Sequence, residues 1–578
     1  MKNILSIFLV IVCSNCNFFA QTFVFGGAVR GTWTKVNSPY LVQGAIMIAN
    51  DSTLTIEPGV KVEFQGHYKL LVMGKLIAVG TAIDTIQFTT NNVSLGWFGI
   101  RFENTASTND TSRISFCKIQ RAKANGGSYN DYGGALYLNN FSKLKVSNSL
   151  ISNCTADLNG GAISCSYSNP VIINSKIINN TAINGNGGGI YCENNSSATI
   201  FGNIISSNSA SGNGGGIFNH MDCNSLIANN TISYNSISSA MGNGGGGIIN
   251  VANSATITNN VISYNSVPNS TGGGITDIST GGVYFSLISS NYISNNTALH
   301  GAGLYCNGDN LPVINNVISN NTASNSGGGI RCENSCAAVI TNNTITNNSS
   351  PLGGGIFFTV NSSPTIKNCI IWGNIESTSG KQVFMDDETS DPNFYYCDIM
   401  AGQSAIGLNN NVFYLGNYSN NINASPLFVS PSLGVGNGFS SMLNGWNIQN
   451  GSPCINLGDP SGTYSSTDIT GNNRISGTRI DIGAFESLSS VGLNNESNQE
   501  LIFIYPNPIS SSANIVFEEF HINSVLIITD ILGNDVEKVN FSGRRIMIEK
   551  GLKHSGIYFI TIADSQSKLI FKQKIIIL

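Results

Sequence analysis

The sequence predicts an all-β protein in which a parallel β-helix solenoid is followed by a small β-sandwich. Two observations predict the solenoid: a Gly-rich anchor recurs about every 27 residues between Gly133 and Asn374, and one position of the repeat is always isoleucine. A third predicts the sandwich, because residues 501–578 alternate short apolar strands with turn residues. A unit of this length cannot bury its own apolar face, so successive units must stack and share one core.

Each unit combines a Gly-Gly-Ala/Gly-Ile anchor with a second apolar segment that contains the invariant isoleucine. The isoleucine column comprises Ile151, Ile177, Ile205, Ile232, Ile262, Ile293, Ile318, Ile345 and Ile371. Branched residues in short segments punctuated by Gly and Asn favour strands over helices. We expect the column to lie inside the solenoid, with Gly at the corners and Asn in left-handed turns.

The N-terminus and the overall composition predict an exported chain. Lys2, an apolar run and a polar stretch ending at Ala20 indicate a signal peptide over residues 1–20, and lipidation at Cys16 is the alternative. No later apolar run is long enough for a membrane helix, so no transmembrane segment is expected in the mature chain. A net charge of −5 without a basic cluster makes nucleic acid an unexpected partner.

An aromatic row is the first candidate for a binding site. If the anchor isoleucine points inward, the following residue points outward, and five of these positions are aromatic. They are Tyr137, Tyr191, Phe218, Tyr305 and Phe357. Flat rings repeated along a rod suit the sugar faces of a polysaccharide. The alternative is a row that stabilises itself or lies under a loop.

Polar residues near this row are too sparse to predict catalysis. Glu193 and His220 follow adjacent anchors, Asp222 lies nearby, and Arg331 and Glu333 follow a later anchor. A lyase would need a base and often Ca²⁺, and a hydrolase would need paired acids. The sequence contains neither an HExxH nor a GxSxG motif. We expect a solvated face, with a polysaccharide lyase as the enzymatic alternative.

The densest acids lie after the last clear anchor, at Asp386, Asp387, Glu388 and Asp391. We expect an exposed loop there that could bind Ca²⁺ weakly, and no other cofactor. The cysteines show no metal-like CxxC pairs. Those at equivalent positions of neighbouring units are expected to be buried thiols rather than disulfides: Cys165 with Cys192, and Cys306 with Cys332.

The anchor together with Ile-x-x-Asn, as in residues 257–260 and 340–343, resembles right-handed β-helices of the pectate-lyase superfamily and the repeats of chlamydial polymorphic outer-membrane proteins. Residues 54–62 through 97–100 resemble the opening coils and cap of such helices. Residues 452–458, 468–474 and 480–486 resemble a choice-of-anchor segment that follows β-helices in secreted bacterial proteins. The resemblance implies a right-handed solenoid and surface export, and no particular chemistry.

Motifs at residues 505–508, 530–534, 551–558 and 572–577 resemble the C-terminal sorting domain of the type IX secretion system of Bacteroidota. The resemblance implies recognition by the secretion machinery at the outer membrane, often with removal of the domain. The chain would then be secreted or held on the cell surface. His554 would belong to a sorting turn and not to a catalytic site.

These features predict six regions along the chain: a signal peptide (1–20), an N-terminal cap with the first coils (21–132), the β-helix repeats (133–400), a C-terminal β-helix-associated segment (401–486), a linker (487–500) and the sorting domain (501–578). The predicted function is that of an exported β-helix protein that binds glycans or surfaces. A carbohydrate-active enzyme, either a polysaccharide lyase or a glycoside hydrolase, is the alternative.

Overall fold

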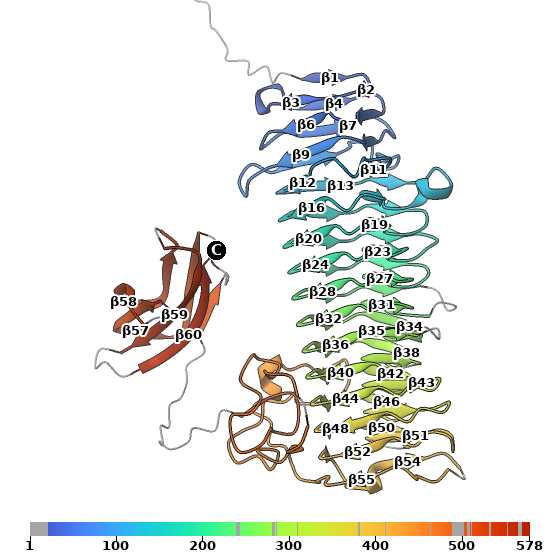
Figure 1. Ribbon diagram of the computed structural model, residues 1–578, viewed down its shortest axis with the longest axis vertical. Helices are drawn as coiled ribbons and strands as arrows, with labels where there is room; N and C mark the ends of the chain where they lie inside the picture. The colour runs from blue at the N-terminus through green and yellow to red at the C-terminus, as the bar shows by residue number, and fades with distance from the viewer. Residues whose placement is uncertain are drawn as a thin grey trace, which may run out of the picture. The chain divides into compact units, whose positions relative to one another are not determined.

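The computed structural model describes residues 21–238, 243–279, 284, 286–308, 310–379, 382–410, 412–462, 464–487, 502–505, 509, 511–530, 533–551, 553–564 and 569–577. The expected signal peptide and the expected linker after Ser487 lie outside these residues. The chain divides into two compact units, Met1–Ser489 and Ser490–Leu578. The first unit is a parallel β-solenoid, as the repeat predicts (Figure 1).

Three solenoid sheets contain fifteen parallel strands each and a fourth contains ten. The first sheet consists of β1 (Thr22–Val24), β4 (Tyr40–Val42), β7 (Lys61–Phe64), β10 (Ile86–Thr89), β13 (Cys117–Gln120), β17 (Leu150–Ser152), β21 (Lys176–Ile178), β25 (Ile204–Ser206), β29 (Thr231–Ser233), β33 (Val261–Ser263), β37 (Tyr292–Ser294), β41 (Val317–Ser319), β45 (Thr344–Thr346), β49 (Ile370–Trp372) and β53 (Asp398–Ile399). The second, which contains the anchors, consists of β2 (Gly27–Ala28), β5 (Ile46–Ile48), β8 (Leu70–Val72), β11 (Ile100–Phe102), β15 (Leu136–Asn139), β19 (Ile163–Ser166), β23 (Ile190–Glu193), β27 (Ile217–His220), β31 (Ile248–Val251), β35 (Ile275–Ile278), β39 (Leu304–Asn307), β43 (Ile330–Glu333), β47 (Ile356–Phe358), β51 (Val383–Met385) and β54 (Ile406–Leu408).

The third sheet consists of β3 (Gly31–Trp33), β6 (Thr53–Ile56), β9 (Lys75–Val79), β12 (Ser112–Ser115), β16 (Leu144–Ser147), β20 (Val171–Ile173), β24 (Thr199–Phe201), β28 (Leu226–Ala228), β32 (Thr256–Thr258), β36 (Leu287–Ser289), β40 (Pro312–Ile314), β44 (Val339–Thr341), β48 (Thr365–Lys367), β52 (Asn393–Tyr395) and β55 (Tyr418–Ser419). The fourth consists of β14 (Lys123–Ala124), β18 (Thr155–Ala156), β22 (Thr181–Ala182), β26 (Ser209–Ala210), β30 (Ser236–Ile237), β34 (Ser266–Thr271), β38 (Thr297–His300), β42 (Thr322–Ser326), β46 (Ser349–Leu352) and β50 (Ile375–Ser379). Short 3₁₀ turns occur at η1 (Lys35–Asn37), η2 (Ser128–Asp131), η3 (Gly402–Ala405) and η4 (Leu443–Trp446).

The isoleucine column forms the interior ladder that the sequence predicts. Ile177, Ile205 and Ile232 are direct partners in successive strands of the first sheet. All nine members of the column are fully buried. Burying one isoleucine contributes about 1.5 to 3 kcal/mol, so the column supplies stability evenly along the rod.

Inner asparagines, each preceded by a residue in the left-handed conformation, recur at the corners of many coils. In Asn295-Asn296, for example, the first residue adopts the left-handed conformation with φ 58°, and the second points inward and is fully buried. The backbone N–H and side-chain amide of Asn265 both donate to the side-chain oxygen of Asn296 in the next coil, at 2.9 and 3.0 Å. The same amide donates to the carbonyl of Ile232 in the preceding coil at 2.9 Å. Inner asparagines therefore satisfy the backbone at each corner.

Residues 425–487, which we call the docked segment, return along the outside of the first sheet (Figure 1). Trp446 and Phe485 pack on Tyr292 and Val317. A second apolar cluster joins Ile448, Cys454 and Ile482 of the segment to Ile370 of the solenoid. The docked segment thus covers the outer face of the first sheet in the later coils.

Left-handed asparagines on both sides of the first sheet hold the docked segment. On one side, the Asn320 and Asn347 amides donate to the carbonyl of Gly434, at 3.1 and 3.2 Å. On the other, the Asn315 amide donates to the carbonyl of Thr467 at 2.9 Å. The left-handed asparagines therefore have two roles. They form the turns of the coils, and their side-chain amides donate hydrogen bonds to the docked segment.

The second unit is a separate antiparallel sheet of five strands. The strands are β56 (Ile502–Tyr505), β57 (Ser512–Thr529), β58 (Asp535–Glu549), β59 (Gly556–Ala563) and β60 (Leu569–Ile577). The long β57 pairs with β56, β58 and β59, and the sheet curls around one apolar core as a half-barrel. This half-barrel takes the place of the expected small β-sandwich.

Candidate functional site

The predicted aromatic row lies on the outer side of the second sheet, but its rings are buried. The exposed fraction of each residue is only 1 to 6%, in Tyr137, Tyr191, Phe218, Tyr305 and Phe357. Their direction agrees with the predicted alternation, because inward neighbours such as Cys192 belong to the main core and the rings do not. The burial favours the alternative of a self-supporting row, and ligand binding by the rings themselves stays a prediction.

Corner loops that fold back over the strands account for this burial. Gly187 has φ 65°, and a Cβ there would lie 2.8 Å from the Cβ of Tyr191, so only glycine permits so close an approach. Tyr132, from an earlier corner loop, contacts both Tyr137 and Tyr191 edge to face. The guanidinium of Arg101 stacks 4.3 Å from the centre of the Tyr137 ring.

Half-buried polar side chains lie above the rings, and we call Glu193, His220, Asn307 and Glu333 the polar row. The Tyr191 hydroxyl donates to Glu193 at 3.0 Å, and the Phe218 ring lies 5.3 Å from that of His220. Burial raises the pKa of Glu193 and lowers the pKa of His220. Asp222, the other residue singled out here, is exposed in a left-handed turn.

Arg331 and Glu333 lie in a compact polar cluster. Glu333 accepts hydrogen bonds from Arg331 Nε at 2.8 Å and from the Tyr305 hydroxyl at 3.0 Å. The Arg331 guanidinium also lies 4.7 Å from the centre of the Phe357 ring. Both Arg331 and Glu333 are therefore already engaged in contacts within the cluster.

Sequence reasoning missed three members of this cluster: Asn307, His300 and Ser326. Asn307 donates to the Tyr305 hydroxyl at 2.9 Å, and His300 Nδ1 lies 2.8 Å from Ser326 Oγ. Burial, followed by the charge of Arg331, lowers the pKa of His300 to about 4. His300 and Ser326 lie on the fourth sheet, where strand lengths vary from coil to coil. The repeat therefore does not predict that these two side chains lie together.

The acidic residues after the last anchor serve as loop caps. Asp387 accepts from the backbone N–H of Thr389 at 2.9 Å, Asp391 from that of Leu415 at 2.8 Å, and Asp386 from the Asn409 amide at 3.0 Å. Within the part of the chain that the structure describes, no group of three or more His, Cys, Asp or Glu residues is placed to hold a metal. Binding of Ca²⁺ by this loop stays a prediction.

The eleven cysteines of the described residues are all buried, and none of them forms a disulfide. Cys165 lies beside Cys192 in the neighbouring strand, and Cys306 beside Cys332, as the register predicts. Burial raises the pKa of the Cys154 thiol to about 12. These side chains act as small apolar residues of the core.

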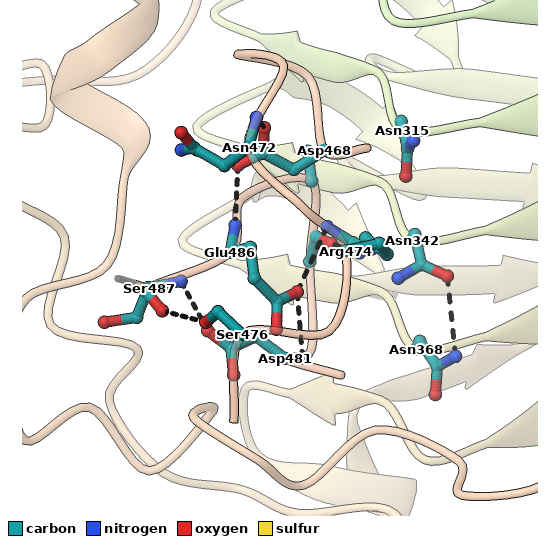
Figure 2. A network of polar contacts seen from close by, with 12 residues as sticks. Asn315, Asn342, Asn368, Asp468, Asn472, Arg474, Ser476, Asp481, Glu486 and Ser487 are labelled. Atoms are coloured by element: carbon teal, nitrogen blue, oxygen red, sulfur yellow. Dashed lines mark hydrogen bonds and ion pairs between the residues drawn. The ribbon is translucent and has the colours of Figure 1, made fainter. Parts of the chain in front are cut away.

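A buried acidic network lies inside the docked segment (Figure 2). Asp468 accepts from the backbone N–H groups of Asn472 and Glu486, at 2.9 and 2.8 Å. Asp481 accepts from the backbone N–H of Ser487, and Arg474 donates to the carbonyl of Gly483. Asp468 and Asp481 thus hold the loops of the docked segment together through backbone N–H groups.

Glu486 gives the docked segment a pH dependence. Burial, followed by the negative charge of Asp481, raises its pKa from 4.5 to about 8. An acid with a raised pKa in the folded state stabilises that state when protonated, so this contribution is present below about pH 4.5 and disappears as the pH rises through 8. We expect the docked segment to lose roughly 2 kcal/mol between pH 6 and pH 9.

Proteolysis rates of residues 425–487 at pH 6 and pH 9 measure this loss. Glu486→Gln should remove the pH dependence, because an amide cannot ionise, whereas Glu57→Gln in the early coils should leave it unchanged. An identical pH dependence in Glu486→Gln and the wild-type chain would rule Glu486 out as its source.

Two family models match the chain. Residues 281–426 match the model described as a right handed beta helix region, and residues 503–578 match that of the secretion system C-terminal sorting domain. No curated protein and no solved structure matches the chain. The structure thus defines a right-handed parallel β-helix protein with a separate sorting unit.

More particularly, the chain is a β-helix protein with the sorting domain of the type IX secretion system, which supports its export to the cell surface or medium of a Bacteroidota-type bacterium. The sorting domain implies handling by the type IX secretion machinery. Over the described residues, no helix is long and apolar enough to cross a membrane.

Proposed function

We propose that this exported β-helix protein binds glycans along the outer side of its second sheet without cleaving them. The main observation behind the proposal is that tyrosines of the aromatic row hydrogen-bond to carboxylates of the polar row. The hydroxyls of Tyr191 and Tyr305 fix the carboxylates of Glu193 and Glu333. Rings beneath the surface thus position groups that can hydrogen-bond sugar hydroxyls.

The polar row consists of two pairs separated by Val251 and Ile278, an arrangement that fits a polymer better than a single small ligand. Glu193 and His220 lie in neighbouring strands β23 and β27, and Asn307 and Glu333 in the neighbouring pair β39 and β43. Strands of adjacent coils are about 4.8 Å apart, so the two residues of each pair are one strand spacing apart and the two pairs can contact separate parts of one chain. Several weak contacts on one chain add to a much higher overall affinity.

A carbohydrate-active enzyme is the second candidate, and the cluster around Arg331 is the observation that favours it. His300 is neutral at pH 7 because its pKa lies at about 4, so its imidazole could accept a proton in a lyase reaction. Its Nδ1, however, faces Ser326, and Arg331 is engaged by Glu333. A glycoside hydrolase would need a second carboxylate beside Glu333, and the cluster of Tyr305, Asn307, Arg331 and His300 supplies none.

Retention on immobilised neutral and acidic polysaccharides tests the binding proposal. Glu333→Gln should weaken retention about tenfold, because it weakens the charge-assisted contacts that fix the polar row. Tyr191→Phe should weaken it about threefold, because it removes the hydroxyl that holds Glu193 while keeping the ring. Asp51→Asn, the same change of charge at an exposed turn, is the matched control. Equal retention of all four chains, or no retention of the wild type, would refute the proposal.

A further inference from the structure

A second candidate site lies on the first sheet, where two tyrosines interrupt a column of corner residues. The column runs Asn179, Ser207, Tyr234, Tyr264 and Asn295, and each residue donates its backbone N–H to the following coil. All five residues adopt the left-handed conformation, with φ between 56° and 58°. Asparagine tolerates this conformation well, whereas a bulky residue such as tyrosine seldom adopts it. Two tyrosines in succession therefore favour a use other than the turn itself.

Tyr234 and Tyr264 form an exposed stack. Their ring centres are 5.0 Å apart and the ring planes differ by 6°. The Tyr234 and Tyr264 side chains are 59% and 39% exposed. Tyr264 covers one face of the Tyr234 ring, and the residue on the other side is Ser207, which is too short to cover the second face. This face is therefore open to a flat ligand.

Short hydroxyl groups lie beside the open face. Ser206 Oγ lies 3.4 Å from Ser207 Oγ and 3.4 Å from Ser233 Oγ. The surface thus combines an aromatic face with short hydroxyls, which suits the apolar face and the hydroxyl groups of a pyranose ring.

Charge limits the class of ligand. Between Glu193 and Asp277 the sequence contains one acid, Asp222, and neither lysine nor arginine. The exposed Lys176 of the preceding coil pairs with Ile204, at the opposite end of strand β25 from Ser207, so the residues that frame the open face carry no charge. A neutral polysaccharide loses nothing by binding an uncharged surface.

The same face in the following coils is already occupied, since the docked segment begins at the next position of the column. The amide of Asn295 donates to the carbonyl of Phe439 at 2.6 Å. The two tyrosines therefore stand at the last positions of the column that the docked segment leaves open.

We propose that the open face of Tyr234, framed by Ser206, Ser207 and Ser233, stacks on a sugar ring of a neutral polysaccharide. This site is separate from the polar row. It rests on the proposed function only in that the exported protein meets glycans outside the cell.

Depletion of the full chain from solution by insoluble cellulose, mannan and starch tests the site, with calcium alginate as the acidic comparison. The wild type should bind at least one neutral polymer more tightly than alginate. Tyr234→Asn should weaken that binding at least tenfold. Asparagine is the residue that this column otherwise uses, so the melting temperature of the variant should not fall.

Two controls separate this site from other causes. Tyr167→Ala removes another exposed tyrosine in the left-handed conformation, 53% exposed, and should leave binding unchanged. Glu333→Gln weakens binding at the polar row, and its effect should add to that of Tyr234→Asn in the double variant, so that a failure of the polar row and a failure of the tyrosine site are read independently. Unchanged binding in Tyr234→Asn, or wild-type binding to alginate alone, would overturn the proposal. A wild-type dimer in light scattering that Tyr234→Asn dissociates would also overturn it, by assigning the face to a second copy.

Discussion

Replacing Trp446 with alanine should release the docked segment from the first sheet. Trp446 is fully buried, packs edge to face on Phe428 at 5.4 Å, and lies in one cluster with Tyr292, Val317 and Phe485. Removing a buried tryptophan costs about 3 to 5 kcal/mol, because it leaves a cavity as well as lost apolar contacts. The cost falls on the docking of residues 425–487, since the solenoid coils beneath have their own core.

Limited proteolysis followed by peptide mapping measures this release. Cleavage within residues 425–487 should become at least tenfold faster in Trp446→Ala, while the β-sheet circular dichroism of the solenoid persists. Phe439→Ala, a change at a half-exposed ring of the same segment, should have little effect. Wild-type protection in Trp446→Ala would show that the corner asparagines alone hold the segment.

Asn265→Ala should destabilise the middle of the solenoid by roughly 3 to 5 kcal/mol. The side chain of Asn265 accepts from the backbone and amide N–H groups of Asn235, both at 3.0 Å, and donates to Asn296 and to the Ile232 carbonyl. Alanine leaves these buried groups without partners, and water cannot reach the interior to replace them.

Hydrogen exchange locates this loss along the rod. Protection should fall in β29, β33 and β37, which surround Asn265, and persist in distant coils because each coil contacts only its neighbours. Asn224→Ala, at an exposed corner residue, is the matched control. Uniform protection in Asn265→Ala would mean that the inner asparagines contribute little beyond the shape of the turn.

The sequence predicts the solenoid well because its period has a direct physical meaning. A residue that recurs in every unit and is always isoleucine must occupy an equivalent buried position, as Ile205 does. The number of coils is harder to predict, because strands such as β1 and β55 lie outside the clear repeat. The isoleucine column marks nine units, whereas three of the sheets contain fifteen strands each.

The candidate sites are less predictable, because they depend on what covers each face. Alternation gives the outward direction of Tyr191, but only the fold of the corner loops reveals that its ring is buried. Asn315, which holds the docked segment, and Asn174, which lies exposed in an earlier coil, occupy equivalent positions in the repeat. Tyr234 replaces the asparagine found at other positions of the same corner column. This departure from the repeat can be recognised in the sequence, but it does not resemble a catalytic motif.

Incubation of the purified full chain with a panel of acidic and neutral polysaccharides tests most directly whether the β-helix binds glycans without cleaving them. Retention, ultraviolet absorbance of unsaturated chain ends and newly formed reducing ends are measured on the same samples. We predict retention of the protein on at least one polymer with no new ends of either kind. Unsaturated ends would identify a lyase and reducing ends a hydrolase, and either result, or the absence of retention on every polymer, would contradict this account.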